Sequence, residues 1–144
     1  MNSVKKYVAE FIGTFVLVLF ACGTAAVTGC TTNKIDVAYF ITALAFGLVI
    51  VAMAYSIGNI SGCHINPAVS IAMLVNGTLS IKDFVGYVIA QFAGATAGAG
   101  VLRLILGPES SLGANGLYNE DALLSFIVEV ILTFVFVLAI LGVT

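Results

Sequence analysis

The polar residues from Ser61 to Val69 interrupt two long apolar runs, and they carry the chemistry of this chain. They read Ser-Gly-Cys-His-Ile-Asn-Pro-Ala-Val. Pro67 suits the first position of a helix, because the N–H that proline lacks has no helical partner there. Asn66 is a strong helix cap whose side-chain oxygen can accept from the first turn. Its NH₂ group is then left to donate into whatever space lies beyond.

The backbone before this cap is expected to supply acceptors. The residues that we expect to line a pore with their backbone are Gly62, Cys63, His64 and Ile65. We also expect the carbonyl of Gly58 to lie outside any helix. The start of a short helix adds about half a positive charge at Asn66. A hydrogen-bond donor at Asn66 and backbone acceptors along the path that leads to it suit a small, neutral, hydrogen-bonding permeant.

Cys63 and His64 are the residues here that could suggest a nucleophile or a metal site. Two adjacent residues do not make such a site, and no acid follows to orient the histidine. The three cysteines of the chain lack metal-binding spacing, and a disulfide cannot be argued from their positions. We therefore expect no catalytic residue, no metal and no cofactor, and we expect Cys63 to be reachable from a pore.

The composition of this chain indicates that it lies in a membrane. It is 61% hydrophobic and 8% charged, whereas a soluble domain is usually about 25% charged. The sequence therefore predicts a single all-α membrane domain over residues 1–144. The net charge of −2 gives no indication of a nucleic-acid partner.

Four apolar runs are long enough to span, since about 20 residues cover the hydrocarbon core. They are Tyr7 to Gly29, Val37 to Ile57, Phe84 to Leu106 and Ala122 to Thr144. Between the second and third runs lies Gly58 to Ser80, whose apolar part, Ala68 to Val75, is only about 12 Å long as a helix. It can reach the middle of the bilayer, and non-helical backbone at that depth must be buried in protein or line a cavity. We expect a re-entrant half-helix.

Charged residues give a weak indication of orientation. If the spans alternate, Lys5, Lys6 and Lys82 share one side, and the other side holds Lys34, Arg103, Glu109, Glu120 and Asp121. The cationic side is normally cytoplasmic. We therefore expect a multi-pass protein of the cell membrane, plasma or inner, with a cytoplasmic amino terminus.

Two segments of the chain also resemble each other. Ala9–Ala25 and Val128–Thr144 share eight identities in seventeen residues, and these pair Glu10 with Glu129 and Thr14 with Thr133. A glutamate facing lipid costs roughly 2.5–3.5 kcal/mol or more, so each should face protein. Three spans separate the copies, which predicts an inverted repeat with its site near the midplane. We expect a first repeat over about 1–107 and the start of a second over about 122–144, the chain ending before a second loop.

The loop motif resembles the first Asn-Pro-Ala loop of the aquaporin, or major intrinsic protein, family. Further similar segments are AEFIGTF, ALAFGL, AQFAGATAGA and VEVILTFVFV, so the resemblance covers all 144 residues. It implies the hourglass fold, of which this chain would supply four membrane helices and one half-helix. It also implies a passive channel that assembles as a homotetramer in the full-length parent.

The resemblance assigns roles to individual residues. Asn66, Pro67 and Ala68 match the motif, with Asn66 donating to water. His64 would present its carbonyl to the pore and brace the loop with its ring, and Glu10 would be a second brace. Phe46 falls at a constriction position where water-selective members carry Phe and glycerol facilitators tend to carry Trp. Glu129 should lack its partner, because its own loop is missing.

The expected function is therefore passive water conduction, although the 144 residues alone are expected to be an incomplete channel. Two alternatives stay open. A glycerol or small-neutral-solute facilitator would share the loop, and Phe46 argues against it. A non-conducting membrane packing or assembly protein would use the loop only as a buried structural break.

Overall fold

The structure, a computed structural model, describes residues 3–30 and 36–143. Every regular element within these ranges is helical. Four helices are long and apolar enough to cross a membrane, namely Ser3–Thr28, Val37–Ser61, Ile81–Leu106 and Ala122–Val143. The predicted all-α fold with four spans and one short helix is confirmed, and the chain is a multi-pass membrane protein.

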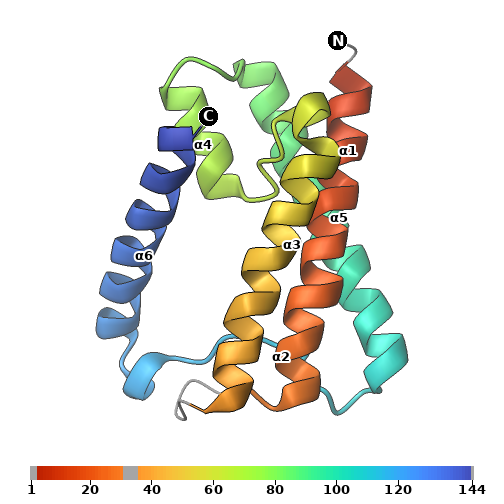
Figure 1. Cartoon of the computed structure of the whole chain (residues 1–144), viewed down its shortest axis with the longest axis vertical. Helices are drawn as coiled ribbons and strands as arrows, with labels where there is room; N and C mark the ends of the chain where they lie inside the picture. Colours follow the sequence, from red (N-terminus) through yellow and green to blue (C-terminus); the bar gives the residue numbers. More distant parts are fainter. Residues whose placement is uncertain (1–2, 31–35, 144) are drawn as a thin grey trace.

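The spans are built from a small number of elements (Figure 1). The first consists of α1 (Ser3–Leu17), a π-helical turn (Val18–Cys22) and α2 (Gly23–Thr28). The others are α3 (Val37–Ser61), α5 (Ile81–Leu106) and α6 (Ala122–Val143), with the short helix α4 (Pro67–Val75) between α3 and α5. A 3₁₀ turn at Tyr118–Glu120 precedes α6. Helix α1 packs against α3 and α5, whereas α6 contacts α4.

The spans alternate in direction. The N-terminus, the start of α5 and the end of α6 lie at one end of the molecule in Figure 1, and α2 and the start of α6 lie at the other. Lys5 and Lys6 in the first turns of α1 therefore share an end with Lys82 in the first turn of α5. Lys34, which belongs to the expected opposite group, lies outside the described residues.

The first span begins at Ser3, ahead of the expected Tyr7, and two further helix boundaries differ from those expected. Helix α3 continues four residues beyond Ile57 to Ser61, because Gly62 adopts a left-handed conformation (φ 87°) that ends it there. The Gly58 carbonyl is consequently helical and accepts from the Gly62 N–H at 2.9 Å, so its expected place outside any helix is wrong. Helix α5 begins at Ile81, ahead of the expected Phe84, because the Ser80 hydroxyl caps it by accepting from Asp83 N–H at 3.1 Å.

Small residues set the distance between α1 and α5. A Cβ atom at Gly94 would collide with the Phe11 carbonyl oxygen, and one at Gly98 would lie 2.9 Å from that of Phe15. Helices α1 and α5 therefore approach each other closely at both positions. Close backbone contact of this kind is a usual source of helix association in membranes.

Two apolar clusters hold the segment between α3 and α4. Val69, Met73, Leu79 and Tyr87 pack between α4 and α5, with α6 residues such as Phe136 and Ile140 against them. Ala9, Ile57 and Ile65 form a second cluster between α1 and the end of α3. The loop is therefore anchored on one side by Ile65 and on the other by α4.

Candidate functional site

The loop Gly62–Ile65 joins α3 to α4 in an uncommon backbone conformation. Gly62, Cys63 and Ile65 have φ values of 87°, 53° and 42°. Positive φ is uncommon for any residue but glycine, and for a β-branched residue such as Ile65 it is an outlier. Each such residue costs on the order of 1–3 kcal/mol, so the surroundings must hold it in place.

The Glu10 carboxylate holds this loop. It is completely buried and accepts four hydrogen bonds. Oε1 accepts from the Ser61 hydroxyl at 2.6 Å and from the His64 N–H at 2.9 Å. Oε2 accepts from the Ile65 N–H at 2.7 Å and from the Gln91 amide at 2.8 Å. Because an ionised carboxylate has only acceptors, four convergent donors match it well.

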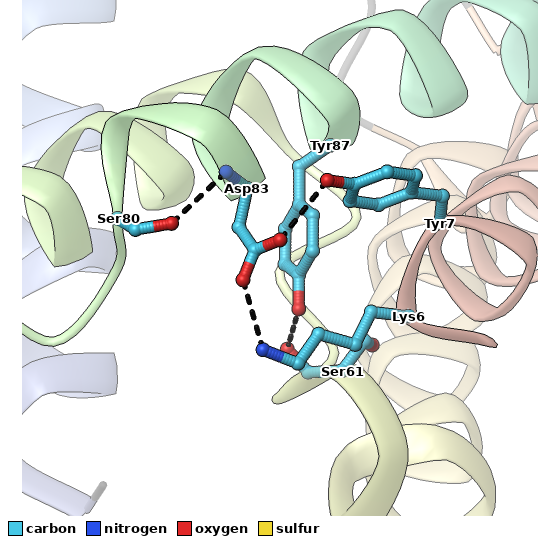
Figure 2. Close-up of polar contacts among 6 residues, drawn as sticks. All are labelled: Lys6, Tyr7, Ser61, Ser80, Asp83 and Tyr87. Atoms are coloured by element: carbon cyan, nitrogen blue, oxygen red, sulfur yellow. Dashed lines mark hydrogen bonds and ion pairs between the residues drawn. The ribbon is translucent and has the colours of Figure 1, made fainter. Parts of the chain in front are cut away.

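The end of α3 is tied to α5 by Tyr87. Its hydroxyl donates to the Ser61 carbonyl oxygen at 2.6 Å, as Figure 2 shows. The Ser61 hydroxyl in turn accepts from the Cys63 N–H at 3.1 Å. These bonds satisfy backbone groups at the point where the helical hydrogen-bond pattern stops.

A second set of side chains lies behind the loop. The Gln91 amide nitrogen donates to Glu10 and, at 3.0 Å, to the Ser70 hydroxyl on α4. Ser70 Oγ lies 3.1 Å from His64 Nδ1, and the His64 ring meets that of Tyr87 edge-on at 4.9 Å. Gln91 therefore forms interhelical hydrogen bonds to α1 and to α4.

The N-terminal turns of α1 and α5 meet in a third polar contact, also drawn in Figure 2. Asp83 Oδ2 pairs with Lys6 Nζ at 2.9 Å, and Oδ1 accepts from the Tyr7 hydroxyl at 3.0 Å. Because Tyr7 also packs edge-on against Tyr87, this contact is continuous with the residues that support the loop.

Asn66 and Pro67 begin α4 as the sequence indicates. Asn66 Oδ1 accepts from the Ala68 N–H at 2.8 Å, and Pro67 takes the first helical position. Within the described part of the chain, neither the Asn66 NH₂ group nor the carbonyl oxygens of Gly62–Ile65 have a hydrogen-bond partner. The loop and Asn66 therefore present donors and acceptors that the described part of the protein leaves unused.

Two cavities flank this segment. One, of about 310 Å³, is lined by Lys6, Ser61, Gly62, His64 and Tyr87 among others. The second, of about 580 Å³, lies between α4 and α6. Its walls include Ala68 and Glu129, and the Glu129 carboxylate has no hydrogen bond or ion pair within the described residues.

Phe46 lies in α3, half-buried, and lines neither of these cavities. Its place at a constriction therefore stays a prediction.

The Cys63 side chain is half-buried, and the His64 side chain is buried. Cys22, Cys30 and Cys63 are all free, and the described residues hold no cluster of metal-binding side chains.

The amino-acid sequence can also be compared with those of known proteins. The family model described as Major intrinsic protein matches residues 1–144. The chain belongs to this family.

Two relatives of this major intrinsic protein carry the name Aquaporin Z. The one from Brucella melitensis is 39% identical over 150 residues, covering 97% of the chain and 65% of the relative. The one from Rhodopseudomonas palustris is 37% identical over 155 residues, covering 100% of the chain and 64% of the relative. The chain thus spans a little under two thirds of the length of these relatives.

Sequence reasoning about this major intrinsic protein missed Ser61, Ser70 and Tyr87. A signal existed for Tyr87, since it lies four residues before Gln91 and so shares a helix face with it. The two serines gave no such signal. Serine is common at helix ends for local reasons, and their contacts with Glu10 and Gln91 join residues 51 and 21 positions apart.

Proposed function

We propose that the whole protein is a passive water channel and that the loop Gly62–Ile65, with Asn66, forms part of its pore. One observation carries this proposal. A strained loop is held by a buried carboxylate, and neither its carbonyl oxygens nor the Asn66 NH₂ group that follows them has a hydrogen-bond partner among the described residues. Unused backbone polar groups within a membrane require water or a permeant.

In this proposal a water molecule donates to the loop carbonyls and then accepts from Asn66 Nδ2–H. Pro67 and Ala68 continue α4, whose N-terminal dipole favours a water oxygen directed toward that end. The exchanged bonds are hydrogen bonds alone, so passage needs no catalytic group, metal or cofactor. The protein would act as a channel rather than an enzyme.

Water is favoured over glycerol as the permeant. The matched relatives are named Aquaporin Z, and Phe46 is the residue type that water-selective members carry at the proposed constriction, where glycerol facilitators tend to carry Trp. The further partners that we propose are the lipid bilayer and three other copies of the chain in a homotetramer. Large parts of α3 and α6 are exposed apolar surface that lipid or neighbouring subunits would cover.

The test is water flux through proteoliposomes that contain the protein produced from its intact gene. Asn66→Ala removes both the cap and the unpartnered NH₂ group, so we expect water flux to fall to the level of empty vesicles. The lost cap should cost only about 1 kcal/mol of stability. Asn59→Ala, at an exposed position on α3 whose side chain has no hydrogen-bond partner among the described residues, is the matched control and should leave flux unchanged.

The alternative of a non-conducting packing protein predicts a different result. In that case the unsubstituted protein gives no flux above empty vesicles, and Asn66→Ala changes only thermal stability. Flux of glycerol as fast as that of water would instead favour the solute facilitator.

A further inference from the structure

The hydrogen bonds behind the loop determine which atom of His64 carries a proton. Glu10 sets the starting point, because the backbone N–H groups of His64 and Ile65 occupy its two oxygens as donors. A carboxylate with these partners requires the NH₂ side of Gln91, not its carbonyl oxygen, at 2.8 Å. The orientation of the Gln91 amide is therefore determined.

The same NH₂ group donates its second hydrogen to Ser70 Oγ at 3.0 Å. Ser70 is completely buried, so its own hydroxyl hydrogen needs an acceptor within the protein. Among the described residues the available acceptor is His64 Nδ1 at 3.1 Å. If Nδ1 carried a hydrogen, the Ser70 hydroxyl would be left without an acceptor.

A neutral imidazole whose Nδ1 accepts must carry its hydrogen on Nε2. Nε2 has no hydrogen-bond partner among the described residues. It is also not fully enclosed by them. Gly62 leaves this atom uncovered, since a Cβ at position 62 would lie only 3.2 Å from Nε2. Both residues line the 310 Å³ cavity.

We infer that Glu10, Gln91 and Ser70 act in series to hold His64 as its Nε2–H tautomer, which donates to a small neutral acceptor such as a water oxygen in this cavity. His64 is thereby a binding residue through its ring. The edge-on contact with Tyr87 holds the ring in the required orientation. The assignment of water as the acceptor rests on the proposed function, whereas the tautomer does not.

The experiment is nitrogen NMR of the chain in lipid bilayers with isotope-labelled histidine. The sequence contains one histidine, so the ring signals report His64 alone. We expect one protonated and one unprotonated ring nitrogen near neutral pH, the protonated one being Nε2 and exchanging magnetisation with water. A proton on Nδ1, or on both nitrogens, would overturn the inference. Absence of contact with water would overturn the binding role.

A substitution tests the series of hydrogen bonds. Ser70→Ala removes the donor to Nδ1, so we expect loss of the single tautomer and a mixture of both forms. Ser56→Ala, at an exposed position where, among the described residues, the hydroxyl bonds only to the Ala52 carbonyl, should leave the spectrum unchanged. A pure Nε2–H tautomer in folded Ser70→Ala would contradict the inference. If that variant does not fold, the spectrum of the unsubstituted chain decides, and neither result depends on measured water flux.

Discussion

Glu10 concentrates four hydrogen bonds on two oxygen atoms, and each bond reaches a residue that shapes the loop. Two of the donors, the N–H groups of His64 and Ile65, are backbone groups that have no helical partner. At the scale of single residues, this carboxylate offsets the conformational cost of Cys63 and Ile65, whose φ values are positive. We propose that Glu10 is the brace of the loop and that His64 supports it through Ser70.

Glu10→Gln tests this role. A glutamine offers one acceptor oxygen and brings an NH₂ group against donors that it cannot satisfy. We expect the free energy of unfolding to fall by about 3 kcal/mol, the scale of lost bonds to a charged group. Thermal unfolding in detergent, followed by circular dichroism, measures the change.

The matched control is Glu129→Gln. Glu129 pairs with Glu10 in the predicted repeat, but its side chain is exposed and makes no hydrogen bond in the described part of the chain. We expect a change within about 0.5 kcal/mol. Equal losses at the two positions would show that removal of charge, and not the contacts of Glu10, explains the effect.

Glu10 could be singled out from the sequence because a carboxylate in an apolar membrane span is expected to face protein and not lipid. Sequence reasoning found Asn66 and Pro67 because capping is local chemistry. It did not find Ser61, Ser70 or Tyr87, whose roles depend on which helix face meets the loop. That information lies in packing across long sequence distances rather than in local residue type.

At the scale of helices, α1 and α5 form the platform on which the loop rests. Their separation depends on Gly94 and Gly98, where the carbonyl oxygens of Phe11 and Phe15 approach the opposite backbone. Glu10 and Gln91 face each other across this contact, so a wider spacing would stretch the 2.8 Å hydrogen bond between them. The packing of two helices is thus coupled to the position of the loop.

Gly94→Ala should separate the two helices. The added methyl would collide with backbone, which cannot rotate away as a side chain can, so we expect a loss of about 1–3 kcal/mol in stability. Gly100→Ala on the same helix is the control, since nothing lies within 4 Å of the added methyl. It should be neutral or slightly stabilising. A neutral result at Gly94 in the same unfolding assay would show that the α1–α5 contact is looser than described.

The elements themselves were largely predictable, and their ends were not. Apolar length located all four spans, because the bilayer sets a minimum length for each. The end of α3 at Ser61 escaped prediction, since Gly58, Asn59 and Ser61 are polar or small and resemble a loop in sequence. Tertiary contacts determine where α3 ends, because Glu10 and Tyr87 both bind Ser61 and keep that turn helical.

At the scale of the whole molecule, the alternating spans place two identifiable positions at opposite ends. Cys30 follows the end of α2, and Lys82 lies in the first turn of α5 (Figure 1). If the amino terminus is cytoplasmic, Cys30 faces outward and Lys82 faces the cytoplasm. Lys5 and Lys6 join Lys82 on that side, as the excess of cationic residues at cytoplasmic ends would require.

Labelling with a membrane-impermeant maleimide tests this orientation. With Cys22→Ser and Cys63→Ser, we expect Cys30 to be labelled in intact cells. With all three cysteines replaced by serine and Lys82→Cys added, labelling should require permeabilised cells. The reverse pattern would place the amino terminus outside and reverse the direction in which the Asn66 loop enters. Labelling of both positions from outside would contradict the alternation of the spans. Between Cys30 and Lys82 the chain crosses once through α3, and α4 returns to the side from which it entered. The two positions can therefore lie on one side only if α3 fails to cross.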